Sequence, residues 1–260
     1  MKVVILCGGK GTRLREETEF RPKPMVPIGN RPILWHIMKT YAHYGHKEFI
    51  LCLGYKGEYI KEYFRNYLWN TCDSTLTLGR NPAVQFHNSH EEEDWKVTLA
   101  DTGEESMTAY RVKLIQKYLS ARETFLLTYG DGLSTIDING SIEAHNVAGK
   151  VCTISAVHPA GRFGTLRIEG DRVHTFSEKP QYEEAYVNGG YMVCDYRLFD
   201  YLSDNPNMMF ERKPMDDLVR DGQLNAYKHE GFWQPMDTYQ ETQYLNKVWS
   251  EGRAPWKVWS

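Results

Sequence analysis

An apolar segment that stops at two glycines opens the chain. Residues 2–7 read Lys-Val-Val-Ile-Leu-Cys and are followed at once by Gly8 and Gly9. A short, β-branched and continuous apolar run that ends in glycine is typical of a parallel strand buried on both faces. The first segment therefore predicts a strand inside a sheet, with a glycine-rich turn at its carboxyl end.

The following segments alternate between helix and strand. A helix is predicted after Asn30-Arg31-Pro32, where Asn30 supplies a capping side chain and Pro32 fits the first turn, and Gly45 ends it. Residues 49–53 predict a second buried strand, and apolar residues from 59 to 68 recur with helical spacing. This succession predicts an α/β fold, a Rossmann-like doubly wound mixed sheet flanked by helices.

The rest of the chain continues this pattern without an internal boundary. Strands are predicted at 75–78, 84–87, 96–99, 124–128, 151–157, 187–194 and 224–228, and helices at 108–119, 138–147 and near the C-terminus. A hairpin at 164–176 predicts a small β-rich sub-lobe, placed at about residues 159–195. Because 260 residues are near the upper limit for one core and no linker is present, residues 1–260 are expected to form one domain.

Charge and cysteine usage exclude several classes of function. Lys and Arg number 31 against 34 Asp and Glu, so the formal net charge is −3 and neither nucleic acid nor an anionic membrane is an expected partner. The apolar run before Gly8 is too short for a secretory signal, and no later stretch approaches the roughly 18 apolar residues of a spanning helix. Five widely spaced cysteines indicate reduced thiols and a cytoplasmic location.

The glycine-rich loop after the first strand is the strongest signal for a binding site. It reads Gly8-Gly9-Lys10-Gly11-Thr12-Arg13, at the sheet edge where α/β folds bind ligands. The sequence departs from the dinucleotide GxGxxG pattern at Leu14 and from the P-loop ending Gly-Lys-Ser/Thr. A tight turn is the simpler alternative, but Arg13 and a proline-flanked Lys23 favour an anion site.

Two aspartates on separate loops are candidate metal ligands. Asp131 lies between glycines after an apolar strand, and Asp237 lies just before the last helix. Mg²⁺ is commonly held by one or two carboxylates together with substrate phosphates. Spacing alone favours the simpler alternatives, a turn aspartate at 131 and a helix N-cap at 237.

A third group follows the predicted hairpin. Lys179, in Glu178-Lys179-Pro180, could bind a phosphate, and Glu178 and Asn188 could hydrogen-bond sugar hydroxyls. The glycines after Asn188 would let the backbone approach a polar ligand. A surface ion pair and a β-bulge are equally good explanations of these residues.

Together and in this order, these motifs resemble the sugar-phosphate nucleotidyltransferases over essentially the whole chain. The resemblance rests on residues 6–14, 23–26, 32–38, 54–57, 98–103, 128–132, 161–164 and 231–238. The Gly-Asp-Gly triplet at 130–132, the run Trp-Gln-Pro-Met-Asp at 233–237 and residues 254–257 are particular to the branch that transfers a cytidylyl group. The sequence departs from the family pattern at Cys7, commonly alanine, and at Ala109-Tyr110, where glycines are usual.

The resemblance implies an activity and a set of site residues. The reaction would transfer a cytidylyl group from CTP to α-D-glucose 1-phosphate, with Mg²⁺ as cofactor and a homo-oligomer as the expected assembly. Arg13, Lys23, Asp131 and Asp237 would be catalytic, and the two aspartates would hold the metal. The implied nucleotide-binding residues are Leu6, Gly8, Gly9, Lys10, Gly11, Thr12, Arg13, Lys23, Ser106, Thr108 and Arg111. The implied sugar-phosphate residues are Tyr129, Gly164, Glu178, Lys179, Asn188 and Gly189.

Other functions remain open at the level of the sequence. No residue by itself distinguishes cytosine from uracil or thymine, so UTP or dTTP is an alternative donor. A glycosyltransferase ordinarily has an Asp-x-Asp pair, which Asp131-Gly132-Leu133 does not supply. A non-catalytic nucleotide-sugar sensor would be expected to have lost a charged site residue, and none of those named is lost. The acidic run 91–94 could be a solvated loop, a lid or a subunit contact.

Overall fold

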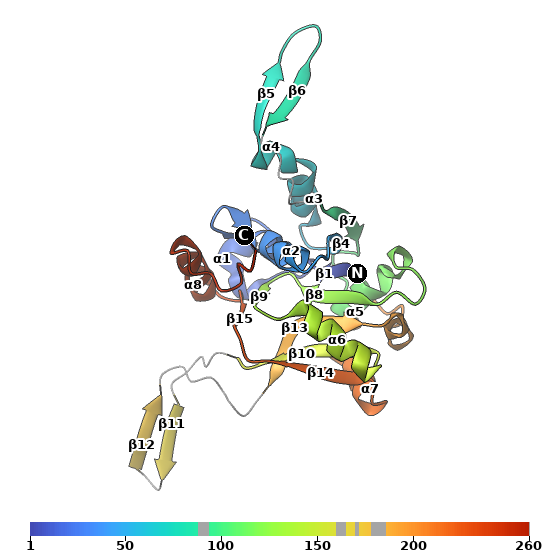
Figure 1. Cartoon of the computed structure of the whole chain (residues 1–260), viewed down its shortest axis with the longest axis vertical. Coiled ribbons are helices and arrows are strands. Elements are labelled where there is room, and N and C mark those ends of the chain that lie inside the picture. Colours follow the sequence, from blue (N-terminus) through green and yellow to red (C-terminus); the bar gives the residue numbers. More distant parts are fainter. Residues whose placement is uncertain (88–93, 160–164, 170–171, 178–185, 260) are drawn as a thin grey trace.

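The computed structural model describes residues 1–87, 94–159, 165–169, 172–177 and 186–259 (Figure 1). Its strands are β1 (Lys2–Leu6), β2 (Pro27–Ile28), β3 (Arg31–Pro32), β4 (Glu48–Leu53), β5 (Asp73–Thr77), β6 (Ala83–His87), β7 (Lys96–Asp101), β8 (Phe125–Tyr129), β9 (Gly132–Ser134), β10 (Cys152–Val157), β11 (Thr165–Glu169), β12 (Arg172–Ser177), β13 (Val187–Cys194), β14 (Leu224–His229) and β15 (Trp233–Pro235). Its helices are α1 (Arg15–Thr18), α2 (Ile33–His43), α3 (Gly57–Arg65), α4 (Tyr67–Thr71), α5 (Thr108–Leu114), α6 (Ile138–Ala148), α7 (Lys213–Arg220) and α8 (Tyr239–Ser250), with 3₁₀ turns η1 (Thr12–Leu14), η2 (Lys23–Met25), η3 (Gln116–Tyr118) and η4 (Tyr196–Tyr201).

A seven-stranded mixed sheet forms the body, in the order β14-β10-β13-β8-β1-β4-β7. The strands β8, β1, β4 and β7 are parallel, whereas β13 is antiparallel to both of its neighbours, β8 and β10. Leu6 pairs with both Cys52 and Tyr129, so the ends of β1, β4 and β8 lie at one edge. The predicted mixed, doubly wound α/β fold is confirmed.

Each face of the sheet is covered by its own apolar core. Val3 and Ile5 lie in the core that contains residues of α2, α3 and α8, and Val4 and Leu6 lie in the other, with residues of α5 and α7. Successive side chains of a strand point to opposite faces, so an uninterrupted apolar run is what two buried faces require. This explains why β1 shows no polar alternation in the sequence.

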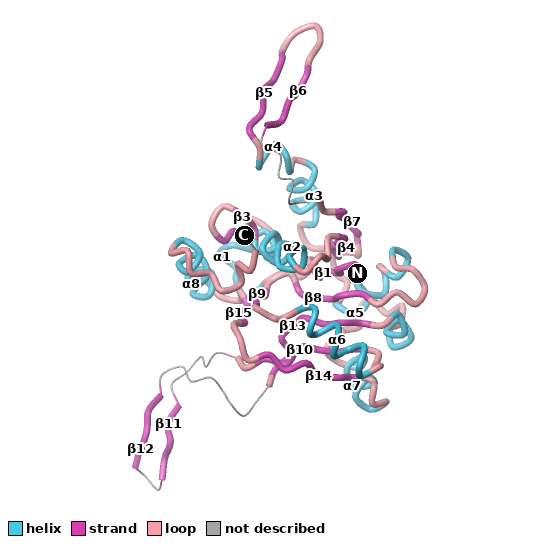
Figure 2. The backbone as a smooth tube through the Cα atoms, viewed as in Figure 1, coloured by secondary structure: helices cyan, strands magenta, loops and turns pink. Residues whose placement is uncertain are grey.

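Two hairpins stand away from this body (Figure 2). The β5–β6 hairpin follows α4, and the β11–β12 hairpin lies in the range predicted as the sub-lobe. That range extended to residue 195, whereas β13 is an internal strand of the central sheet. The structure therefore separates the β11–β12 hairpin, and not the whole of 159–195, from the sheet.

Several local expectations were wrong, each because of a contact distant in sequence or a turn. Asn30 does not cap α2: it lies in the turn of the β2–β3 hairpin, and Pro32 occupies the N-cap position without a side-chain hydrogen bond. The helix predicted over 59–68 is broken at Asn66 into α3 and α4. The helix α7 was not predicted, and the acidic residues 91–93 lie outside the described residues.

A buried histidine fastens the C-terminal segment to α2. His36 is fully buried; its Nε2 lies 3.0 Å from the Ile28 carbonyl oxygen, and its Nδ1 lies 3.3 Å from the Trp256 indole Nε1. Because a carbonyl can only accept and an indole N–H can only donate, these contacts define a neutral imidazole protonated at Nε2. Burial lowers the pKa of His36 from 6.5 to about 4.

His36 should make the stability of the fold pH-dependent. Since its pKa is lower in the folded than in the unfolded chain, its contribution is complete above pH 6.5 and is lost as the pH falls toward 4. We expect this group to reduce the free energy of unfolding by about 1.4 kcal/mol per pH unit in that window. The free energy of unfolding is measured by urea denaturation at several pH values between 4 and 6.5, and it should depend less steeply on pH in His36→Gln than in the wild type. His43→Gln, which replaces an exposed histidine of the same helix, is the matched control. Equal slopes in all three proteins would contradict this assignment.

Candidate active site

A pocket of about 280 Å³ opens at the edge where β1 and β8 end. It is lined by Leu6, Cys7, Gly8, Gly9, Gly11, Thr12, Arg13, Lys23, Pro24, Ser106, Met107, Thr108, Arg111, Tyr129, Gly130 and Asp131. Every residue expected to bind the nucleotide is among them except Lys10, whose ammonium instead lies 2.8 Å from Glu105 Oε1. A larger, shallower groove of about 1020 Å³ over η4 and α7 is lined by none of the predicted site residues.

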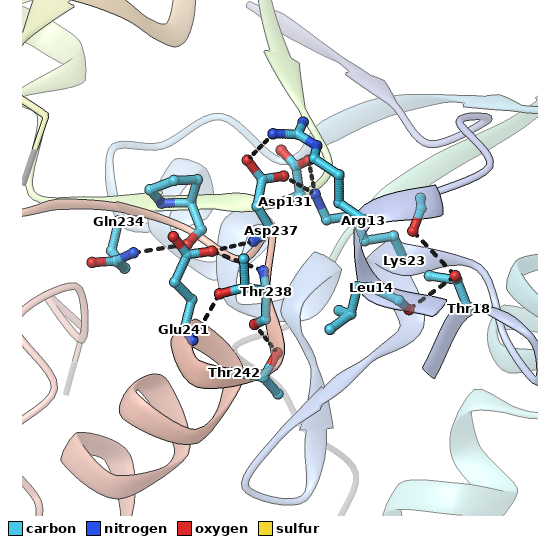
Figure 3. Close-up of polar contacts among 12 residues, drawn as sticks. Arg13, Leu14, Thr18, Lys23, Asp131, Gln234, Asp237, Thr238, Glu241 and Thr242 are labelled. Atoms are coloured by element: carbon cyan, nitrogen blue, oxygen red, sulfur yellow. Dashed lines mark hydrogen bonds and ion pairs between the residues drawn. The ribbon is translucent and has the colours of Figure 1, made fainter. Parts of the chain in front are cut away.

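Four charged side chains converge beside this pocket (Figure 3). Lys23 Nζ lies 2.6 Å from Asp131 Oδ2 and 2.5 Å from Asp237 Oδ1, although these residues are 108 and 214 positions away. Arg13 Nη1 lies 2.6 Å from Asp237 Oδ2. The ammonium of Lys23 is almost completely buried, so its charge has to be neutralised by neighbouring protein groups, here the two carboxylates.

The electrostatics of Lys23 follow from this geometry. Burial by itself would lower the pKa of Lys23, but the neighbouring carboxylates of Asp131 and Asp237 outweigh it and raise the pKa above its ordinary value. Lys23 therefore remains an ammonium at physiological pH. It presents a fixed positive charge where the glycine loop, the β8–β9 turn and the segment before α8 meet.

Local structure places each of these groups. Lys23 begins the turn η2, between Pro22 and Pro24, and Met25 N–H donates to the Pro22 carbonyl at 2.8 Å. Asp131 lies in the turn between β8 and β9, as its flanking glycines suggested, and its carbonyl accepts a hydrogen bond from Met236 N–H at 2.8 Å. That bond joins the two aspartate-bearing segments directly.

The N-cap alternative for Asp237 is wrong. Thr238 caps α8 in a capping box with Glu241, whose carboxylate accepts hydrogen bonds from the Asp237 and Thr238 N–H groups. Because Thr238 satisfies the helix terminus, the Asp237 carboxylate is available to Lys23 and Arg13.

Arg111 is placed differently from its expected role at the base. Its buried guanidinium donates to five protein acceptors: the carbonyls of Gly8, Leu53, Gly103 and Glu104, and the Thr102 hydroxyl. A Cβ at Gly8 or Gly54 would overlap this guanidinium, so glycine is required at both positions by close approach. In the structure, the hydrogen bonds of Arg111 connect the chain segments at the carboxyl ends of β1, β4 and β7. A contact between Arg111 and the base stays a prediction.

The residues expected at the sugar phosphate are only partly described. Tyr129 lines the pocket, and Asn188 Oδ1 accepts a hydrogen bond from Gly190 N–H at 2.7 Å. The Gly189 carbonyl accepts a hydrogen bond from Trp233 Nε1 at 2.7 Å, which fixes the start of β13 against β15. Gly164, Glu178 and Lys179 lie outside the described residues.

The structure adds one residue that sequence reasoning missed. Glu211 accepts hydrogen bonds from the hydroxyls of Tyr129, at 2.5 Å, and Thr108, at 2.7 Å. It stands in the polar sequence Phe-Glu-Arg-Lys-Pro, where no spacing or motif distinguished it from a surface glutamate.

Comparison with known proteins assigns the family. Residues 2–246 match the family model described as Nucleotidyl transferase. The chain belongs to the nucleotidyl transferase family. The match covers all the described residues that form the pocket and the charged cluster.

Two curated relatives and one solved structure are similar to this nucleotidyl transferase over nearly its whole length. It is 48% identical to a Glucose-1-phosphate cytidylyltransferase from Salmonella typhi over 259 residues, covering 100% of each chain. It is 46% identical to a Bacillus subtilis protein named "Probable glucose-1-phosphate cytidylyltransferase", again over 100% of both. The crystal structure of HddC from Yersinia pseudotuberculosis complexed with GMP-PN superimposes with a TM-score of 0.67 at 24% identity, covering 95% and 99% of the two chains, which shows the shared fold. Among the described residues, no helix has the length and apolar character needed to span a bilayer.

Proposed function

We propose that this chain transfers the cytidylyl group of CTP to α-D-glucose 1-phosphate, forming CDP-glucose and pyrophosphate. The observation that carries the proposal is the full-length identity of 48% with a protein of that activity. The pocket beside the cluster of Lys23, Arg13 and two aspartates supports it, because both substrates are polyanions.

In the proposed reaction a phosphate oxygen of glucose 1-phosphate attacks the α-phosphorus of CTP. The bond from the α-phosphorus to the β-bridging oxygen breaks, and pyrophosphate leaves. A phosphate monoester is already nucleophilic at neutral pH, so the site needs alignment and charge stabilisation more than a general base. The N–H groups of the loop 8–13 would hold the triphosphate, Arg13 would neutralise the departing pyrophosphate, and Lys23 the attacked α-phosphate.

The carboxylates at the site fit Mg²⁺. Asp131 and Asp237 meet at one ammonium, and among the described residues no three His, Cys, Asp or Glu side chains are arranged to hold a metal ion by themselves. Mg²⁺ commonly takes one or two protein carboxylates and completes its coordination with water and substrate phosphates. Asp131 and Asp237 would hold the metal, which when bound supplies further positive charge beside the phosphates.

Pyrophosphate release tests this function. The protein is mixed with glucose 1-phosphate, Mg²⁺ and CTP, UTP, dTTP or GTP in separate reactions, and we expect the fastest release with CTP. Faster release with UTP or dTTP would keep the reaction class and change the donor. No release with any of the four would favour a non-catalytic nucleotide-sugar sensor.

Lys23→Ala should lower turnover by about two to four orders of magnitude, as at comparable electrostatic sites. The substitution removes the cation that faces the phosphates, while Arg13 remains paired with Asp237 and should preserve the fold. Turnover is measured together with the melting temperature. Lys96→Ala, which removes a lysine paired with Glu48 where β4 and β7 begin, serves as the control. Turnover like that of the unsubstituted protein would remove Lys23 from the mechanism.

Asp131→Asn should raise the Mg²⁺ concentration for half-maximal rate by about tenfold or more, since a neutral amide is a weaker ligand for this hard cation. The rate is titrated with Mg²⁺ at saturating substrates. Asp73→Asn, in the exposed β5–β6 hairpin, should leave the titration unchanged. An unaltered titration in Asp131→Asn would limit Asp131 to its role in the turn.

We also propose a homo-oligomer, with the β5–β6 hairpin as the contact. The hairpin exposes Leu76, Val84 and, at its tip, Leu78, which is 85% exposed. A two-stranded hairpin is marginal by itself, so apolar side chains at its end favour a partner surface. Sedimentation should give a multiple of 30.3 kDa, and Leu78→Asp should shift the mass toward 30.3 kDa. A monomeric wild type would contradict this.

A cytoplasmic location completes the proposal. All five cysteines are free thiols, and the sulfurs of Cys152 and Cys194 lie only 4.0 Å apart on adjacent strands without a bond. Unbonded thiols this close together are what a reducing compartment would preserve.

A further inference from the structure

A single carboxylate accepts hydrogen bonds from two residues that line the pocket. Glu211 Oε1 lies 2.5 Å from the Tyr129 hydroxyl. Glu211 Oε2 lies 2.7 Å from the Thr108 hydroxyl, at the first residue of α5. The family resemblance implied Tyr129 at the sugar phosphate and Thr108 at the nucleotide, so Glu211 connects the two expected subsites.

The position of Glu211 is fixed although its side chain reaches solvent. Main-chain hydrogen bonds join its segment to α5, from Met107 N–H to the Pro206 carbonyl at 2.8 Å and from Ala109 N–H to the Met208 carbonyl at 3.1 Å. The preceding residue, Phe210, is completely buried, and its N–H donates to the Thr108 hydroxyl at 2.8 Å. Glu211 is therefore held against the pocket by the backbone on which it stands.

The hydrogen bonds to Glu211 use the only proton of each hydroxyl. A hydroxyl has one proton to donate, and an ionised carboxylate can only accept. The hydroxyls of Tyr129 and Thr108 both donate that proton to Glu211, so each can offer only lone pairs to a ligand. Hydrogen bonds to a charged acceptor are the stronger kind, so this orientation is well defined.

We propose that Glu211 is a positioning residue that sets the hydrogen-bonding direction of Tyr129 and Thr108 and so tunes both substrate subsites at once. The inference rests on the proposed function for the identity of the two substrates. Each oriented hydroxyl accepts from a donor on its substrate: a sugar hydroxyl at Tyr129, and a hydroxyl or amino group of the nucleotide at Thr108. Loss of the carboxylate would let these protons turn toward the pocket and oppose the substrate's donor.

Equilibrium binding separates this role from a general structural one. Calorimetry gives the dissociation constants of CTP with Mg²⁺ and of glucose 1-phosphate, each alone, beside steady-state KM values. Thr108→Val should weaken CTP only, Tyr129→Phe should weaken glucose 1-phosphate only, and Glu211→Gln should weaken both, each by about fivefold to tenfold. Arg212→Gln, the next residue along and outside these hydrogen bonds, should change neither.

A double variant provides the decisive comparison. In a Tyr129→Phe background, Glu211→Gln should still weaken CTP and should no longer affect glucose 1-phosphate, because the hydroxyl through which it acts is gone. A persisting effect on glucose 1-phosphate, or single-variant constants within twofold of wild type, would overturn the proposal. So would a lowered melting temperature in Glu211→Gln with both affinities unchanged.

The same measurements distinguish a failure of the proposed reaction from a failure of the proposed role of Glu211. Binding of both ligands by the wild type without pyrophosphate release would contradict the proposed reaction while the comparison of dissociation constants still decides the role of Glu211. A wild type that binds neither ligand would overturn both.

Discussion

The buried ammonium of Lys23 between two carboxylates is the interaction on which the arrangement of the site depends. An ammonium removed from water is stable only with opposite charge beside it, and Asp131 and Asp237 supply that charge from segments far away in sequence. Their meeting fixes the glycine loop, the β8–β9 turn and the segment before α8 relative to one another. The same charges that would act on phosphates also hold these three segments together.

A second buried cation, Arg111, fixes the backbone around the glycine loop. The N–H groups of Arg111 donate to acceptors after β1, at the end of β4 and after β7, and its guanidinium fills the space next to Gly8 and Gly54. These bonds hold the loops in place before any ligand arrives. Electrostatic stabilisation of a reaction requires such preorganised groups, because donors that must first reorient contribute less. The glycine loop is thus closely packed against Arg111. Glycine is needed at Gly8 because a Cβ there would overlap the guanidinium, and not only because glycine allows more backbone conformations.

Glu211 extends this organisation from the backbone to the direction of individual protons. Its segment is bonded to the start of α5, and its carboxylate reaches both Thr108 and Tyr129. If the pocket binds both substrates as proposed, this shared charged acceptor would make the nucleotide and sugar subsites depend on the same residue. Such a link would let the two subsites be tuned together without any movement of the backbone.

The sequence by itself determined the features that repeat locally or are spelled in short motifs. The apolar runs of β1, β4 and β8 predicted buried strands, and the glycines at 8 and 9 predicted the turn after β1, because burial, periodicity and glycine content act within a few residues. The anion site in the loop 8–13 stays a prediction. Only the tertiary structure decided that Thr238 and not Asp237 caps α8, that β13 lies inside the sheet, and that Glu211 contacts two residues of the pocket. These outcomes depend on contacts between residues tens to hundreds of positions apart, and such contacts are selected by packing and charge neutralisation across the whole fold, which no local pattern encodes.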